Sequence, residues 1–192
     1  MARNDRSRWD EAHSHNVNEA LPDPSPFLAE NIALLAPGST LDMAAGSGRN
    51  ALFLATHGHR VLAADLSRVT LDAIRQRNRA MQLVQVDLDR PCFRQSSLDN
   101  VVCINFLDRS LFPEICTWLR PGGVLLLDTF LIDQRTVGHP RNPDFLLGHN
   151  ELLERLRGYR ILQYREGAVA EPSGTSYRAG VVAARKPLGS EN

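Results

Sequence analysis

The chain has 192 residues, 43% of them hydrophobic, which is enough apolar material for one domain with one core. Its 22 basic and 22 acidic side chains balance, so the basic excess typical of nucleic-acid-binding proteins is missing and no nucleic-acid partner is expected. No apolar run reaches the roughly 18 residues of a membrane span, and the charged start does not resemble a signal peptide. We therefore expect a cytoplasmic protein with no membrane contact, present as a monomer or a homodimer.

The first segment, residues 1–24, is polar and contains Trp9, His13 and His15. Such a segment is ordered only when it folds over the domain or a ligand. We expect residues 1–24 to form an N-terminal arm, a candidate lid, and residues 25–192 to form the single domain.

Beyond the arm, the apolar pattern alternates between the periods of helices and strands. Helices are predicted over residues 27–35, 50–57, 67–79, 110–119 and 150–156. Strands are predicted over residues 40–43, 60–64, 83–86, 100–104, 124–129, 160–165 and 176–184. Ser67 is a favourable N-cap for its helix. Residues 87–99 are too few and too polar for a full crossover helix, and residues 171–174 are typical of a hairpin turn.

Apolar strands that alternate with helices indicate a parallel sheet covered on both faces. The sequence therefore predicts an α/β, doubly wound, Rossmann-like fold with a seven-stranded, mostly parallel sheet that ends in an antiparallel hairpin.

The strongest motif runs from Leu41 to Asn50, where a strand leads through a tight glycine turn into a helix. Because Gly46 and Gly48 lack a Cβ atom, the backbone there can approach a ligand closely. The helix that follows offers unpaired amides at its N-terminus, which suits a carboxylate or a phosphate.

Two acidic residues close the next two strands. Asp65 ends the second strand and can accept hydrogen bonds from both hydroxyls of a ribose. Asp87 ends the third strand and can accept a hydrogen bond from an adenine amino group. Because ligands bind at the carboxyl edge of such sheets, the glycine turn and both carboxylates are predicted to share one rim.

This pattern resembles the class I S-adenosylmethionine-dependent methyltransferases, whose first motif is D-x-G-x-G-x-G. Asp42, Ala44, Gly46 and Gly48 fill its places, with Ala44 where the first glycine is usual. The Arg120-Pro121-Gly122-Gly123 turn also matches the family. The resemblance implies S-adenosyl-L-methionine as cofactor and S-adenosyl-L-homocysteine as product. It implies a cofactor site formed by Asp42, Ala44, Gly46, Gly48, Arg49, Asn50, Asp65, Leu66, Asp87, Leu88, Asn105 and Phe106.

A closer resemblance is to small bacterial methyltransferases of the tellurite-resistance type. It rests on Pro24-Ser25-Pro26-Phe27-Leu28 and on Gly48-Arg49-Asn50-Ala51. That type is implied to methylate small chalcogen oxyanions or thiol-like nucleophiles. The final hairpin is expected to be short, with Arg178 as its only clear cation before Arg185.

The acceptor is expected to be a small molecule. The segment after the fourth strand, residues 104–109, lacks the N-P-P-Y or D-P-P-Y motif of enzymes that methylate base amines. Asn105, His139 and Arg141 are the candidate catalytic residues. Asn105, like Phe106, is placed under the cofactor or beside the methyl group, and the other two are candidates for holding an anionic acceptor. They lie in a loop whose further polar candidates are Asp133, Arg135 and Asn142.

Other interpretations stay open at this point. A nicotinamide-dependent oxidoreductase would share the glycine turn, but the chain lacks a Tyr-x-x-x-Lys pair. A catalytically silent module that only binds the cofactor would keep the same rim. No metal is predicted, because Asp128 and Asp133 are candidate ligands without a full set and His57-Gly58-His59 is typical of a surface turn.

Overall fold

The computed structural model describes residues 21–91, 93–171 and 174–186. Residues 1–20 of the predicted lid, with Trp9, His13 and His15, lie outside the described residues. Within the described ranges, no helix is long and apolar enough to cross a membrane.

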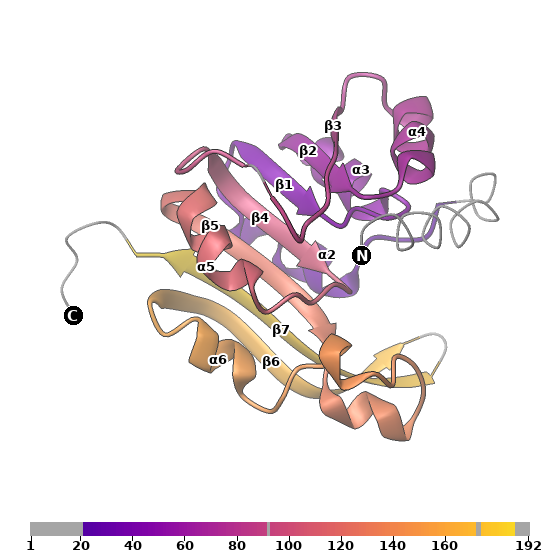
Figure 1. The fold of residues 1–192 in the computed structure, drawn as a ribbon, viewed down its shortest axis with the longest axis vertical. Coiled ribbons are helices and arrows are strands. Elements are labelled where there is room, and N and C mark those ends of the chain that lie inside the picture. The colour runs from indigo at the N-terminus through magenta and orange to yellow at the C-terminus, as the bar shows by residue number, and fades with distance from the viewer. Residues whose placement is uncertain (1–20, 92, 172–173, 187–192) are drawn as a thin grey trace.

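Strands and helices alternate along the chain as the sequence predicts (Figure 1). The strands are β1 (Ser39–Met43), β2 (Arg60–Asp65), β3 (Gln82–Gln85), β4 (Leu98–Ile104), β5 (Leu119–Phe130), β6 (Tyr159–Glu171) and β7 (Gly174–Arg185). The α-helices are α2 (Pro26–Asn31), α3 (Arg49–Thr56), α4 (Arg68–Arg77), α5 (Leu111–Trp118) and α6 (Glu151–Arg155). Three short 3-10 helices are η1 (Ile32–Leu34), η2 (Ile132–Thr136) and η3 (Pro143–Phe145).

All seven strands join one sheet in the order β3-β2-β1-β4-β5-β7-β6. The first five strands pair in parallel, and β7 pairs antiparallel with both β5 and β6. The predicted fold class is confirmed. The order reverses between β1 and β4, and this is where ligands bind in open sheets of this type.

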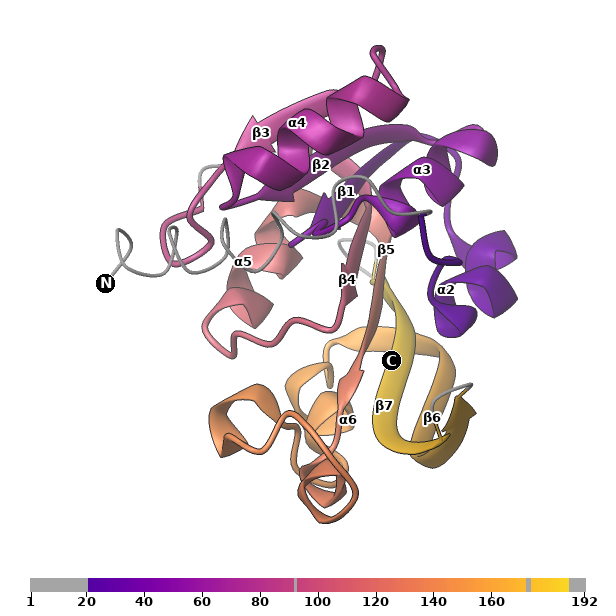
Figure 2. The same cartoon turned by 90° about the vertical axis from the view of Figure 1, so that its right-hand side faces the viewer.

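Helices cover both faces of the sheet because successive strand residues point to opposite sides (Figure 2). In β4, Val101 and Cys103 are buried in the cluster that includes α5 and α6, and Val102 and Ile104 in the cluster that includes α2, α3 and α4. Trp118 of α5 is 1% exposed and anchors the first cluster. Because successive residues of β4 are buried on opposite faces, the strand is held from both sides, and the residues at its end have a fixed position.

The largest differences from the predicted elements are in α2, β5 and β6. The helix predicted over 27–35 is an α-helix only as far as Asn31 and continues as η1. The strand predicted from residue 124 begins at Leu119. The expectation of a short final hairpin is wrong: β6 runs to Glu171, because its ladder with β7 continues to the Glu171–Gly174 pair.

Candidate functional site

The turn after β1 places three residues in the left-handed region of backbone space. Ala44, Gly46 and Gly48 have φ angles of +56°, +51° and +79°. Ala44 adopts this conformation although it carries a Cβ atom, which costs of order 1 kcal/mol. The turn therefore keeps the backbone geometry of the glycine motif even at the position where the sequence departs from it.

The two glycines of the turn serve different purposes. A Cβ atom at Gly48 would lie 2.4 Å from Cγ1 of Ile74, so this glycine lets α4 pack against the start of α3. A Cβ atom at Gly46 would meet nothing nearer than the carbonyl oxygen of Ala44 at 4.0 Å. The space above Gly46 is open, and a ligand can approach the backbone there.

Asp65 fastens the glycine turn to the end of β2. Its Oδ2 accepts a hydrogen bond from the amide of Gly46 at 2.8 Å, and its Oδ1 accepts one from the amide of Ser67 at 2.8 Å. Ser67 also caps α4, since its side chain accepts a bond from the amide of Thr70, as predicted. Each carboxylate oxygen of Asp65 retains a second lone pair, which suits the two hydroxyls of a ribose.

The rim continues to β3. The amide of Val86 donates to the carbonyl of Asp65 at 3.0 Å, which brings the next residue, Asp87, to the same edge. Asp87 is half-buried, and its Oδ1 accepts a bond from the amide of Asp89 at 3.0 Å. The adjacent Leu88 is 8% exposed. Leu66 is half-buried, and its carbonyl accepts a bond from Gln85. The glycine turn, Asp65 and Asp87 thus follow one another along a single rim.

Asp42 is a buried acid directly beneath this turn. Burial, and then the negative charge of Asp65, raise its pKa from 3.8 to about 7, although a bond from the amide of Ala51 and the charge of Arg49 act in the opposite direction. Among the described residues, Oδ2 of Asp42 meets no hydrogen-bond donor. A buried carboxylate oxygen without a partner fits a ligand that brings a positive group, such as the ammonium of an amino acid.

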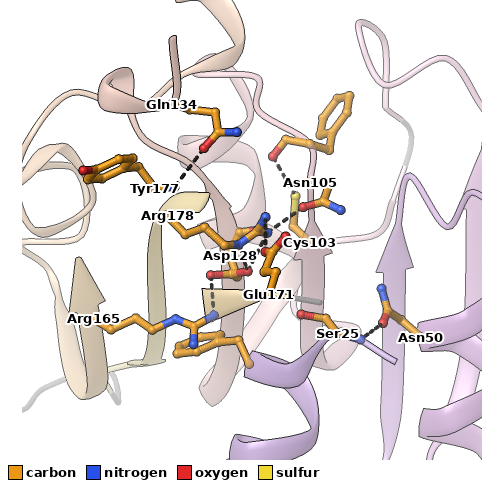
Figure 3. A network of polar contacts seen from close by, with 12 residues as sticks. Ser25, Asn50, Cys103, Asn105, Asp128, Gln134, Arg165, Glu171, Tyr177 and Arg178 are labelled. Carbon is orange, nitrogen blue, oxygen red and sulfur yellow. Dashed lines mark hydrogen bonds and ion pairs between the residues drawn. The ribbon is translucent and has the colours of Figure 1, made fainter. Parts of the chain in front are cut away.

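Arg49 and Asn50 tie the start of α3 to the segment before α2. Oδ1 of Asn50 accepts a bond from the amide of Ser25 at 2.9 Å, drawn in Figure 3, and Nη1 of Arg49 donates to the carbonyl of Asp23 at 3.2 Å. Ser25 and Asn50 belong to the two sequence segments that carry the closer resemblance, and the structure brings these segments into contact.

Asn105 lies at the end of β4, across the switch point from the rim. It is exposed and has a φ of +58°, and its amide donates to the carbonyl of Asp128 at 2.9 Å. Oδ1 of Asn105 accepts a bond from Nη2 of Arg178 at 2.5 Å (Figure 3). Phe106 is partly buried against the α5 side of the core. The side chain of Asn105 is thus held in place by a residue of the hairpin.

An ionic network that the sequence did not predict lies behind Asn105. Asp128 on β5 is 1% exposed and pairs with Arg178 at 2.6 Å and with Arg165 of β6 at 3.2 Å. It is therefore no free metal ligand, and Asp133 contacts His149 instead. The prediction that Arg178 is the hairpin's only clear cation is wrong, because Arg165 of the same hairpin also contacts Asp128. Asp128 within an apolar strand could have indicated this network, because a buried charge requires a partner of opposite charge.

His139 and Arg141 lie between η2 and η3, and both side chains are exposed. The carbonyl of His139 accepts a bond from Nε2 of Gln134, which is itself 6% exposed and accepts a bond from the amide of Tyr177. Gln134 thus connects this loop to β7. The proposed roles of His139 and Arg141 remain predictions. No group of three or more metal-ligating side chains occurs within the described part of the chain.

Comparison with known proteins agrees with this geometry. Residues 40–123 match a family model described as a methyltransferase domain. No curated protein matches the chain.

Several solved structures share the fold. TehB from Haemophilus influenzae aligns with a TM-score of 0.72 and 19% identity over 93% of this chain and 67% of its own. The 1,6-didemethyltoxoflavin-N1-methyltransferase of Burkholderia thailandensis, solved with 1,6-didemethyltoxoflavin and S-adenosylhomocysteine bound, gives 0.69 and 19% over 96% and 87% of the two chains. A SAM-dependent methyltransferase of Methanosarcina mazei gives 0.68 and 18% over 86% and 100%.

Residues 40–123 thus match a methyltransferase domain, and the whole described chain has the fold of the S-adenosylmethionine-dependent methyltransferases among these structures. These findings support an enzyme with S-adenosyl-L-methionine as cofactor and S-adenosyl-L-homocysteine as the product formed from it.

Proposed function

We propose that this methyltransferase acts on a small-molecule nucleophile, namely a thiol, a chalcogen oxyanion or a small acid. The observation that carries the proposal is the buried Arg178 bonded to Asn105, because it puts a fixed cation beside the end of β4. The balanced net charge and the missing N-P-P-Y motif favour a small acceptor over a nucleic acid.

The residues of the rim fit S-adenosylmethionine, which supplies a methyl group already activated on a sulfonium sulfur. Gly46 leaves open space for it, and Asp65 offers lone pairs to ribose hydroxyls. Asp42 offers its unpaired oxygen to the ammonium group. Asp87 is the acid for the adenine side. What the protein contributes is therefore orientation and the exclusion of water.

On the acceptor side, Asn105 and Arg178 orient the nucleophile. S-adenosylmethionine would supply the methyl group to a lone pair of the acceptor held by these two residues. A base is required only when the acceptor must lose a proton. The exposed His139 and Arg141 are further candidates for contacting it. The resemblance to methyltransferases of the tellurite-resistance type favours chalcogen oxyanions among these small-molecule acceptors.

Two measurements on the full chain test the proposal. Calorimetry with S-adenosylmethionine, with S-adenosylhomocysteine and with NADH is expected to show binding of the first two only. Methyl transfer from labelled cofactor is then followed over a panel of thiols, selenite, tellurite and small carboxylic acids. Binding of NADH alone would favour an oxidoreductase. Cofactor binding without transfer to any panel member would favour a silent binding module.

Three expectations from the sequence accompany the proposal: a cytoplasmic location, a monomer or homodimer, and an arm over residues 1–24 that closes on the site. Size-exclusion chromatography with light scattering tests the second. Deletion of residues 1–20, followed by measurement of the acceptor KM, tests the third.

A further inference from the structure

Arg178 is held rigidly on three of its sides. It lies on β7 opposite Phe130 and is 5% exposed. Its Nε and Nη2 donate to Oδ2 of Asp128 at 2.8 Å and 2.6 Å, and its guanidinium lies 4.5 Å from the centre of the Phe130 ring. With Asn105 on Nη2, this guanidinium has a fixed position and direction, as anion recognition requires.

The remaining nitrogen of Arg178 is different. Nη1 reaches Oε1 of Glu171 only at 3.5 Å, which is longer than a good charge-assisted hydrogen bond of about 2.7–2.9 Å. Glu171 is the last residue of β6, at the tip of the hairpin, and its side chain is 29% exposed. Figure 3 shows its carboxylate beside Arg178 and Asp128. The only ion pair on this nitrogen, within the described part of the chain, is therefore loose.

Several arginines share the carboxylates around this contact. The single carboxylate of Asp128 is shared by two guanidiniums, those of Arg165 and Arg178. Arg49 approaches from α3: burial, and then the positive charge of Arg178, lower its pKa, while Asp42 and Glu171 act in the opposite direction. Glu171 thus interacts electrostatically with Arg49 as well as with Arg178, and its pair with Arg178 is long.

We infer that Nη1 of Arg178 binds the anionic group of the methyl acceptor, and that Glu171 occupies this place until the acceptor displaces it. The inference rests on the proposed function and narrows its acceptor to a molecule with a carboxylate or another oxyanion. An incoming oxyanion replaces a loose pair by a short charge-assisted bond. Glu171 acts as an internal competitor, so it sets the acceptor concentration that the enzyme requires.

The sheet order places this subsite on the acceptor side. Asp65 and Asp87 follow β2 and β3, on one side of β1, whereas Arg178 lies on β7, beyond β4 and β5 on the other side. Arg178 contacts Asn105 at the end of β4. An adenosine that lies on the rim is therefore separated from Arg178 by β1, β4 and β5.

Glu171→Gln tests the inference, and Glu30→Gln is the matched control. Glu30 also forms a loose pair with an arginine of this network, Nη1 of Arg165 at 3.8 Å, but it lies on α2 away from Nη1 of Arg178. Calorimetry measures the affinity of selenite and of acetate for the protein saturated with S-adenosylhomocysteine. Glu171→Gln is expected to tighten the binding of at least one probe about two- to fivefold, the scale on which exposed ion pairs act. Glu30→Gln is expected to leave it unchanged.

Three results would overturn the inference: unchanged or weaker affinity for both probes in Glu171→Gln, an equal gain in Glu30→Gln, or an equal gain in affinity for S-adenosylhomocysteine itself. An equal gain in affinity for S-adenosylhomocysteine would indicate that Arg178 binds the cofactor and not the acceptor. A failure of the proposed function looks different, because the wild-type protein would then bind no S-adenosylhomocysteine or would transfer no methyl group to any acceptor.

Discussion

Replacement of Asp42 by asparagine is expected to stabilise the protein at alkaline pH in the absence of cofactor. Burial and the charge of Asp65 raise the pKa of Asp42 from 3.8 to about 7 in the folded chain. Between these two values the folded state keeps a proton that the unfolded state has lost. The free energy of unfolding therefore falls as the pH rises through this window, and above pH 7 the loss is complete. Asparagine does not titrate, so the Asp42→Asn variant avoids this loss of stability.

The magnitude follows from the size of the shift. A shift of about three units at 1.36 kcal/mol per unit corresponds to about 4 kcal/mol above pH 7. Roughly a third of this is already lost at pH 5, so the advantage of Asp42→Asn over the wild type should grow by about 2–3 kcal/mol between pH 5 and pH 8.

Urea unfolding at pH 5 and pH 8, without cofactor, measures this difference. Asp89→Asn is the control, because Asp89 is an exposed carboxylate near the same edge of the sheet. Its advantage over the wild type should be the same at both pH values. If Asp42→Asn and the wild type lose stability in parallel between pH 5 and pH 8, the carboxylate is ionised in the fold without penalty, and the argument for an unsatisfied acid under the glycine turn fails.

Four further substitutions test the site. Asp65→Ala should weaken S-adenosylmethionine binding by about 1.5–3 kcal/mol in calorimetry, the scale of lost bonds to a charged group, and unchanged affinity would remove Asp65 from the site. Gly48→Ala should lower the free energy of unfolding by about 1–3 kcal/mol, because its Cβ meets Ile74 at a positive φ. Gly46→Ala should cost about 1 kcal/mol of stability and weaken cofactor binding more than Gly48→Ala does; the reverse order would contradict the open space seen above Gly46. Arg141→Ala should raise the acceptor KM more than it changes cofactor affinity, and normal kinetics with every accepted substrate would exclude it from the pocket.

Local features of the sequence were sufficient to predict the cofactor rim. A buried strand, a turn with two glycines and a helix are contiguous in the chain, and parallel strands bring their carboxyl ends to one edge of a sheet. Gly46, Asp65 and Asp87 therefore had to meet once the strands were assigned. The cap at Ser67 could be predicted for the same reason, since it depends on a residue only three positions away.

The acceptor side could not be predicted in this way. The length of β6 depends on its ladder with β7, and the positions of Arg165 and Arg178 around Asp128 depend on β7 lying between β5 and β6. Similarly, the role of Asn50 depends on a backbone amide at Ser25, far away in the sequence.

The sequence by itself determined the α/β class, the strand-turn-helix at Gly46 and the acids of the rim, because each is written in residues that are neighbours in the chain. Only the tertiary structure decided which residues surround Asp128 on the other side of the sheet from that rim. A buried charge needs a partner, but the sequence does not state which of several arginines supplies it, and that choice is made by the order of the strands.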